Sequence, residues 1–205
     1  MNLTVDYSPP AYLFGHAALT DKSLNLVHGE CQGFRIVDLG CGEGDLLKHL
    51  SGAQPLTYII RCIGVDPSLP RTTADKSAGW MLTKSRWQDH EVGRLISSDT
   101  VVILSWPANT LDFEASASLI SHLNHAAKVI LIGQETSGVV VGDSALWNHL
   151  ARRDIIGAIR QAANHQFVAV YGRKSGLPGK RGLPLALRYQ EERCGVTGRM
   201  EDWTA

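Results

Sequence analysis

Hydrophobic and polar positions along the chain follow two patterns: short apolar runs of strand length, and stretches in which apolar residues recur at helical spacing. Strands are predicted where the apolar residues are continuous or β-branched, in residues 34–40, 56–66, 99–107 and 127–134. Helices are predicted in residues 44–50 and 114–127, and residues 144–165 are predicted to form one or two helices with Ser144 near the N-cap. Strands with few polar positions that alternate with helices indicate a mainly parallel sheet covered on both faces.

The last part of the chain breaks this alternation. Two further apolar runs, QFVAVYGRK (166–174) and LPLALRYQ (183–190), flank SGLPGKRG, whose glycines and proline indicate a loop. The loop is too short for a crossover helix, so these strands are expected to form an antiparallel pair. Residues 67–79 are expected to be the longest irregular stretch. The predicted fold class is a single three-layer α/β domain over residues 1–205, with an N-terminal segment at 1–34 and the core at 35–205.

Composition narrows the class of protein. The chain has 205 residues and 22.3 kDa, which is enough for one domain with a sizeable core. No apolar run is long enough to cross a bilayer, and the N-terminus lacks the basic start and apolar block of a secretory signal. The four cysteines are scattered without metal-ligand spacing. We therefore expect reduced thiols, a cytoplasmic protein, no metal and no membrane contact.

The net charge of zero hides an asymmetry between the two parts of the chain. Residues 1–150 carry 10 basic and 15 acidic side chains, whereas residues 151–205 carry 10 basic and 5 acidic ones. Four of these cations, Arg173, Lys174, Lys180 and Arg181, flank or occupy the C-terminal loop. Such a loop is expected either to make weak, salt-sensitive contact with nucleic acid or an acidic protein, or to be a solvated surface.

Three glycines separate the first predicted strand from the first predicted helix, at positions 40, 42 and 44. A strand–glycine loop–helix unit lies at the carboxyl edge of an α/β sheet, where such sheets bind ligands, and glycine lets the main chain approach a ligand closely. The dinucleotide fingerprint G-x-G-x-x-G requires a third glycine where this chain has Asp45. Glu43 and Asp45 would also place negative charge beside a pyrophosphate, so dinucleotide binding is disfavoured.

The sequence VDLGCGEG (37–44) instead resembles the first motif of class I S-adenosylmethionine (SAM)-dependent methyltransferases. The resemblance continues in GVDPS, where Asp66 lies 22 residues after Gly44, in RWQD (86–89), which is similar to the third motif, and in Asp99 before the fourth strand. It covers residues 35 to about 135 in order and implies a Rossmann-like methyltransferase domain that binds SAM. By this resemblance the loop holds the amino-acid part and ribose of SAM, the carboxylate at position 66 binds the ribose hydroxyls, and the RWQD segment meets the adenine. The cofactor-binding residues that it implies are Asp38, Gly40, Cys41, Gly42, Glu43, Gly44, Asp66, Pro67, Gln88, Asp89 and Ser105.

The acceptor side is implied at the ends of the fourth and fifth strands, SWPAN (105–109) and GQETSG (133–138). Trp106 is a candidate to pack against a flat acceptor or the sulfonium, and Glu135 is a candidate to orient or deprotonate the acceptor. SWPAN is similar to the [D/N/S]-P-P-[aromatic] signature of amino-group methyltransferases, but with Trp106 at the first proline position and Ala108 at the aromatic position. The Lys-Asp-Lys-Glu set of ribose 2′-O-methyltransferases is absent.

The segment ahead of the first strand is expected to form a helix and a lid, with Tyr12, Phe14 and His16 closing over the cofactor or packing on the sheet. Two functions remain open at this point. The first is a methyltransferase acting on an unidentified small molecule or macromolecule. The second is a catalytically inactive methyltransferase-like module that binds or scaffolds.

Overall fold

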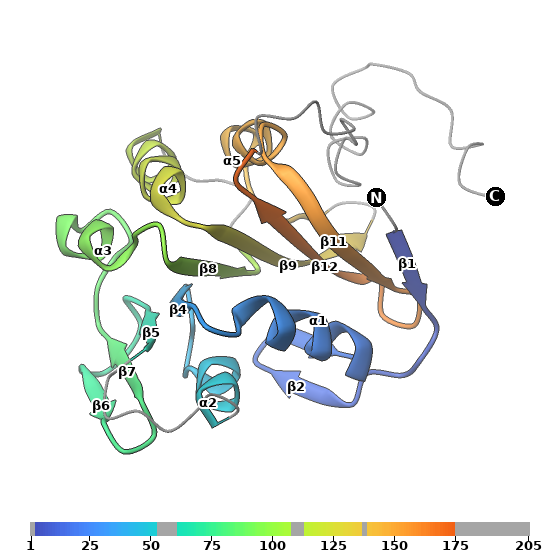
Figure 1. Cartoon of the computed structure of the whole chain (residues 1–205), viewed down its shortest axis with the longest axis horizontal. Coiled ribbons are helices and arrows are strands. Elements are labelled where there is room, and N and C mark those ends of the chain that lie inside the picture. The colour runs from blue at the N-terminus through green and yellow to red at the C-terminus, as the bar shows by residue number, and fades with distance from the viewer. Residues whose placement is uncertain (1–2, 53–60, 108–112, 137–138, 175–205) are drawn as a thin grey trace.

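The computed structural model describes residues 3–52, 61–107, 113–136 and 139–174, and its centre is a ten-stranded mixed sheet (Figure 1). In spatial order its strands are β1 (Leu3–Asp6), β11 (Asp154–Gln161), β12 (Gln166–Gly172), β9 (Lys128–Thr136), β8 (Thr100–Ser105), β4 (Arg35–Leu39), β5 (Cys62–Val65), β7 (Trp80–Thr83) and β6 (Thr73–Asp75), with β10 (Val139–Val140) paired to β9. The strands β9, β8, β4, β5 and β7 are mutually parallel. β12 runs antiparallel to both β9 and β11, and β1 is parallel to β11.

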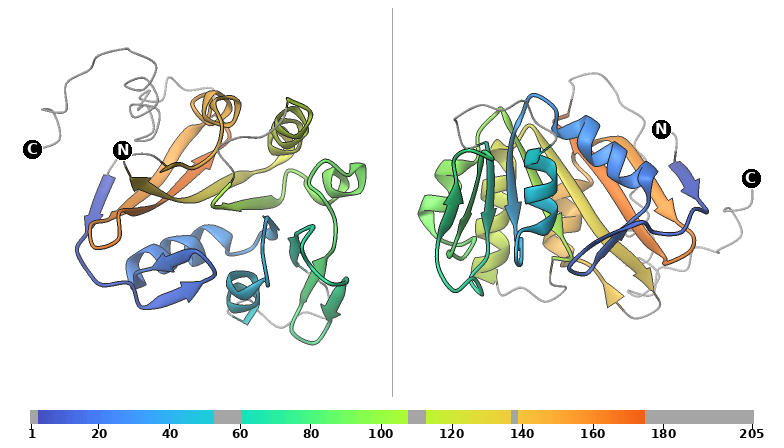
Figure 2. Two further views of the ribbon diagram at one scale, coloured as in Figure 1. Left: turned by 180° about the vertical axis from the view of Figure 1, so that it is seen from behind. Right: turned by 90° about the horizontal axis from the view of Figure 1, so that it is seen from below.

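Two layers of helices cover this sheet, one on each face (Figures 1 and 2). One face carries α1 (Asp21–Cys31), α2 (Asp45–Gly52) and a separate hairpin of β2 (Tyr12–Phe14) and β3 (Ala17–Leu19). The opposite face carries α3 (His90–Leu95), α4 (Phe113–His125) and α5 (Ser144–Leu150). The three-layer α/β architecture predicted from the sequence is confirmed.

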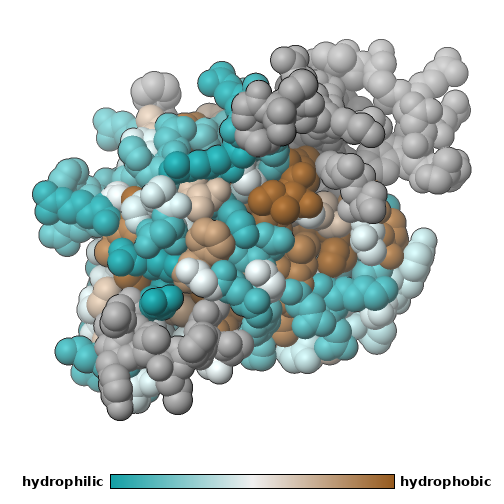
Figure 3. All heavy atoms as spheres, in the orientation of Figure 1, coloured by the Kyte–Doolittle hydropathy of each residue, from teal (hydrophilic) through white to brown (hydrophobic). Residues whose placement is uncertain are grey.

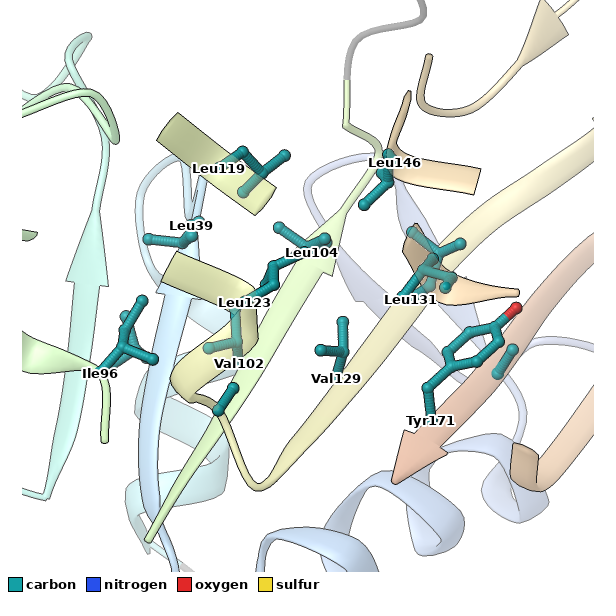
Figure 4. Close-up of a cluster of buried hydrophobic side chains, with 14 of the residues drawn as sticks. Leu39, Ile96, Val102, Leu104, Leu119, Leu123, Val129, Leu131, Leu146 and Tyr171 are labelled. Carbon is teal, nitrogen blue, oxygen red and sulfur yellow. The ribbon is translucent and has the colours of Figure 1, made fainter. Parts of the chain in front are cut away.

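Each face of the sheet has its own hydrophobic core, because successive side chains of a strand point to opposite faces. In β4, Ile36 packs with α1 and α2, whereas Val37 and Leu39 pack with the helices of the other face. Figure 4 shows the second cluster, in which Leu119 and Leu123 of α4 lie over the central strands. All five side chains are at most 1% exposed, and burying each contributes about 1.5–3 kcal/mol relative to an exposed position.

The predicted helices at 144–165 are wrong for their second half, which forms β11. The helix α5 begins at Ser144, directly after the N-cap Asp143, whose side chain accepts a hydrogen bond from the Leu146 amide, so Ser144 lies near the N-cap as predicted. Ile155, Ile156 and Ile159 favour a strand, and a short turn before β12 lets the two strands pair in antiparallel register. The antiparallel C-terminal pair is therefore present but consists of β11 and β12. The predicted strand at 183–190 lies outside the described residues.

The irregular stretch predicted at 67–79 contains the edge strand β6, which pairs with β7. Asp75, the last residue of this strand, stabilises the turn that follows, because its carboxylate accepts hydrogen bonds from the amide and hydroxyl of Ser77. The apolar pattern missed both strands because β6 is short and β7 is only partly buried. Of the strand predicted at 56–66, residues 62–65 are confirmed, and residues 56–60 are outside the described part of the chain.

The surface seen in the orientation of Figure 1 is mostly hydrophilic, and apolar residues gather on the side where β11 and β1 lie (Figure 3). Among the described residues, the exposed large apolar side chains include Val5 of β1 and Ile156 of β11. Among the described residues no helix is both long and apolar enough to span a membrane.

Candidate functional site

A cavity of about 330 Å³ opens at the carboxyl ends of β4 and β8. From β4 the chain builds outward through β5 to β7 and then returns to β8 on the other side of β4. The cavity therefore lies at the point where the strand order reverses, which is where open α/β sheets bind their ligands. Its lining residues are Phe14, Gly15, His16, Asp38, Gly40, Cys41, Gly42, Glu43, Asp45, Leu46, Ser105 and Trp106.

The glycine loop between β4 and α2 forms one wall of this cavity. Gly40, Gly42 and Gly44 all have left-handed backbone conformations, with φ of 80°, 55° and 76°. A Cβ at Gly42 would meet nothing within 4 Å, and one at Gly40 would only touch Trp87 at 4.0 Å. The space in front of this main chain is thus free for a ligand. Gly44 does not line the cavity, because a Cβ there would collide with Leu82 beneath the loop.

Asp38, the next-to-last residue of β4, faces the cavity as a buried carboxylate. It is 1% exposed, and its Oδ1 atom has no hydrogen-bond partner. Burial, and secondarily the negative charge of Asp66, raises the pKa of the Asp38 carboxyl to about 7. A buried carboxylate without a partner is costly, and a cationic group bound in the cavity would supply the partner.

Asp66, which follows β5, is tied to the glycine loop. Its Oδ2 accepts a hydrogen bond from the amide of Gly42 at 2.9 Å, while Oδ1 accepts from the amide of Ser68 at 2.8 Å and from the Ser68 hydroxyl at 2.5 Å. The structure therefore brings the carboxylates of the first and second motifs to the same loop, although Asp66 and the exposed Pro67 do not line the cavity.

The segment similar to the third motif lies between β7 and α3, and neither of its two predicted site residues lines the cavity. Gln88 is exposed, and the carboxylate of Asp89 accepts a hydrogen bond from the amide of Arg86 at 2.8 Å. The neighbouring Trp87, which sequence reasoning missed, lies beside Gly40. His122 of α4 fixes this segment, because its Nε2 donates to the main-chain oxygen of Trp87 at 2.6 Å.

The hairpin β2–β3 contributes Phe14, Gly15 and His16 to a second wall of the cavity. Gly15 is the first central residue of a two-residue turn and has φ of 57°, as a type II′ hairpin requires. Gln166 fixes the hairpin to the start of β12: its Oε1 accepts from the Ala18 amide at 2.8 Å, and its Nε2 donates to the His16 carbonyl at 3.1 Å. That the segment acts as a lid remains a prediction.

Trp106 completes the cavity at the end of β8. Its backbone is left-handed, with φ of 55°, and its amide donates to the carbonyl of Ile132 at 2.9 Å. Its ring lies 6.1 Å from the ring of His16, at 56° between their planes. A bulky side chain rarely adopts this conformation outside functional sites, because it costs about 1–3 kcal/mol.

The two remaining predicted residues are Cys41, which lines the cavity, and Glu135, for which the structure describes only the main chain. Cys41 lines the cavity, and burial, followed by the charges of Asp38 and Asp66, raises the pKa of its thiol, so the thiol stays protonated. Glu135 pairs with Val140 through the main chain of β9, and its side chain is outside the description. Sequence reasoning did not assign the lining residues Asp45 and Leu46 to the site, although both follow the loop directly.

The basic C-terminal loop is described only at its start. Arg173 donates hydrogen bonds to the main-chain oxygens of Ala126 and His125 at the end of α4, where a cation is favourable. Lys174 is exposed, and Lys180 and Arg181 lie outside the described residues, so the predicted contact with nucleic acid or an acidic protein remains a prediction.

Within the described part of the chain, no group of histidine, cysteine and acidic residues is arranged to hold a metal ion. The cavity combines three acidic side chains with three aromatic rings. Such a site is suited to a ligand that carries positive charge and a flat ring system.

No protein-family model matches this sequence, and no curated protein matches it significantly. Solved structures do match, among them several class I SAM-dependent methyltransferases. An uncharacterised protein of Listeria monocytogenes serotype 4b is 14% identical, with a TM-score of 0.50 over 84% of this chain and 77% of that one.

Two methyltransferases match with TM-scores below that of the Listeria protein. Magnesium protoporphyrin IX methyltransferase of Synechocystis PCC 6803, solved with bound SAM, is 16% identical, with a TM-score of 0.48 over 75% of this chain and 79% of that one. A 16S rRNA (adenine(1408)-N(1))-methyltransferase of Catenulisporales acidiphilia is 14% identical, with a TM-score of 0.45 over 82% of this chain and 98% of that one. At these identities the likeness concerns the fold alone. The chain thus has a Rossmann-like α/β fold with a mainly parallel sheet and antiparallel C-terminal strands, as the sequence predicted.

Proposed function

We propose that this protein is a SAM-dependent methyltransferase. The observation that carries the proposal is the buried carboxylate of Asp38, which lacks a hydrogen-bond partner at Oδ1 and faces a cavity beside an open glycine loop. SAM carries an ammonium group that this carboxylate would pair with, and the proposal assigns the ribose hydroxyls to Asp66, whose carboxylate is hydrogen-bonded to the same loop. The donor set of the loop therefore fits the cofactor.

In this proposal the protein contributes positioning more than acid or base chemistry. Bound SAM supplies an electrophilic methyl group, and transfer needs the acceptor atom held in line with it. The loop from Gly40 to Gly44 orients the cofactor, and the hairpin excludes water from one side. Ser105 and Trp106 lie toward the acceptor, and Glu135 is the candidate for taking a proton from it. The whole chain acts as one domain, with residues 1–34 closing over the cofactor.

Calorimetric titration with SAM and S-adenosylhomocysteine tests the binding step. Asp66→Ala is expected to weaken binding by about 1.5–3 kcal/mol, the range for a charged hydrogen-bond partner. Asp75→Ala is the matched control, because Asp75 makes the same pair of bonds to Ser77 that Asp66 makes to Ser68, but on the edge strand β6. Equal affinity in both variants would remove Asp66 from the site, and absence of binding by the unmodified protein would refute the proposal.

Transfer of labelled methyl groups to pooled small molecules and to extracts of the host tests the catalytic step. Trp106→Ala is expected to slow transfer much more than it weakens SAM binding, since the proposal assigns this lining residue to the acceptor. A protein that binds SAM and labels nothing in these pools would instead be the binding or scaffold module.

A further inference from the structure

The two walls of the cavity differ in chemistry. The wall from Asp38 to Leu46 belongs to the loop and helix that the proposed function assigns to SAM. The second wall comes from the hairpin and the end of β8, and three of its five residues, Phe14, His16 and Trp106, carry rings. Whatever lies next to the cofactor in this cavity therefore meets mainly flat side chains.

The charge of the cavity has one sign. Asp38, Glu43 and Asp45 line it, and no lysine or arginine is among the lining residues that the structure describes. A nearby cation, Lys48, is already engaged, because its ammonium donates to the Glu43 carbonyl at 2.8 Å and lies 3.7 Å from the Asp45 carboxylate. An acceptor that brings a phosphate or carboxylate into the cavity beside the cofactor would find no lysine or arginine among the described lining residues, and it would meet several like charges.

The ring wall is held in place before any ligand arrives. Trp106 is fixed by its left-handed backbone and by the hydrogen bond from its amide to β9. The main chain of His16 is fixed through its carbonyl, which accepts from Gln166, and the centroid of its ring lies 6.1 Å from that of the Trp106 ring. A preformed surface binds a flat ligand with little loss of conformational entropy.

The available volume limits the size of the acceptor group. At about 330 Å³ the cavity is at the lower end of the range for small-molecule sites, about 300–1,000 Å³. The part of an acceptor that enters this cavity is therefore small.

From these observations, and resting on the proposed function, we infer that the methyl acceptor is a small aromatic ring compound that is uncharged or cationic, bound against Trp106 and His16. The electrostatics of the cavity select against anionic acceptors, and the ring pair selects for flat ones.

Three shape-matched probes test this inference: quinoline, the N-methylquinolinium cation and the quinoline-4-carboxylate anion. Their affinities for the full chain saturated with S-adenosylhomocysteine are measured at pH 7.5 by ligand-observed NMR. Quinoline and the cation are expected to bind at least about tenfold more tightly than the anion. Trp106→Gly, which suits the left-handed backbone, and His16→Ala are each expected to weaken quinoline binding several-fold, and by a larger factor than they weaken the binding of S-adenosylhomocysteine.

Trp106→Phe keeps a ring at the site and is expected to retain most of the affinity. Leu13→Ala is the control on the same hairpin, because Leu13 is 77% exposed and does not line the cavity. Equal or tighter binding of the anion, no binding of any probe, or unchanged binding by Trp106→Gly would overturn the inference. If S-adenosylhomocysteine itself does not bind, the proposed function fails and the inference with it, whereas bound S-adenosylhomocysteine with no bound ring refutes the inference alone.

Discussion

Lowering the pH from 7.5 to 5.5 is expected to weaken SAM binding because it protonates Asp38. In the free protein burial raises the pKa of this carboxyl to about 7, so it is mostly ionised at pH 7.5 and mostly protonated at pH 5.5. Only the ionised form pairs with the ammonium group of SAM. Binding therefore has to remove a proton from Asp38 at the lower pH, and this proton release reduces the apparent affinity.

The size of the effect follows from the pKa. If the bound cofactor keeps Asp38 ionised throughout this range, the apparent dissociation constant grows in proportion to one plus the ratio of protonated to ionised carboxyl in the free protein. Between pH 7.5 and 5.5 this factor is roughly 25, or about 2 kcal/mol. At pH 6.5, binding is expected to release about 0.8 proton.

Titration calorimetry in two buffers of different ionisation enthalpy measures both the affinity and the number of protons released. Asp38→Asn is the matched variant, because the amide keeps the shape of the carboxylate but does not titrate. The variant is expected to bind more weakly at pH 7.5, to show almost no pH dependence and to release no proton. His16, which also lines the cavity, remains in the variant and serves as an internal control. A variant that keeps the full pH dependence would refute the assignment of the effect to Asp38.

Three further predictions concern stability. Without cofactor, the folded protein holds the proton of Asp38 more tightly than the unfolded chain does. The contribution of this proton to the free energy of unfolding is therefore fully present below about pH 4 and falls by up to about 4 kcal/mol as the pH rises through 7. Asp38→Asn is expected to remove this loss and to be more stable than the unmodified protein in chemical denaturation at pH 8. Gln166→Ala leaves two main-chain groups of the hairpin without their partner and is expected to cost about 1–3 kcal/mol, whereas Gln166→Glu keeps the acceptor for the Ala18 amide and should cost less; equal losses would argue against the two bonds as the cause. Gly44→Ala is expected to destabilise the fold by collision with Leu82 and by its positive φ, and in a double-mutant cycle Leu82→Ala should relieve the collision; strictly additive losses would contradict that contact.

The sequence predicted those parts of the site whose causes are local. A strand that ends in Asp38 and Leu39 and runs into left-handed glycines builds its own loop, since only glycine adopts this backbone without strain. The position of Asp66 could also be predicted, because β5 is parallel to β4 and ends at the same edge of the sheet. Both carboxylates accordingly reach the loop.

The strands β11 and β7 could not be predicted in this way, because their formation depends on the neighbouring strands with which they pair. The segment Asp154–Gln161 has apolar residues that suit a helix or a strand, and its pairing with β12 decides between them. The strand β7 is short and half-buried, so its apolar signal is weak, although Gly64 of the adjacent β5 leaves the room that Leu82 of β7 and Cys41 occupy.

The hairpin is where local reasoning reaches its limit. The sequence FGH at 14–16 contains the glycine that a type II′ turn requires, and this explains why the chain turns there. It does not explain why the turn faces the cavity, because the side chains that hold it come from the far end of the described chain. Gln166 binds the main chain of His16 and Ala18, and Asn164 donates to the Ala18 carbonyl at 2.8 Å. These residues lie at the β11–β12 turn. The strand β12, which lies between β11 and β9 and runs antiparallel to both, therefore also helps to position the aromatic residues of the hairpin at the cavity.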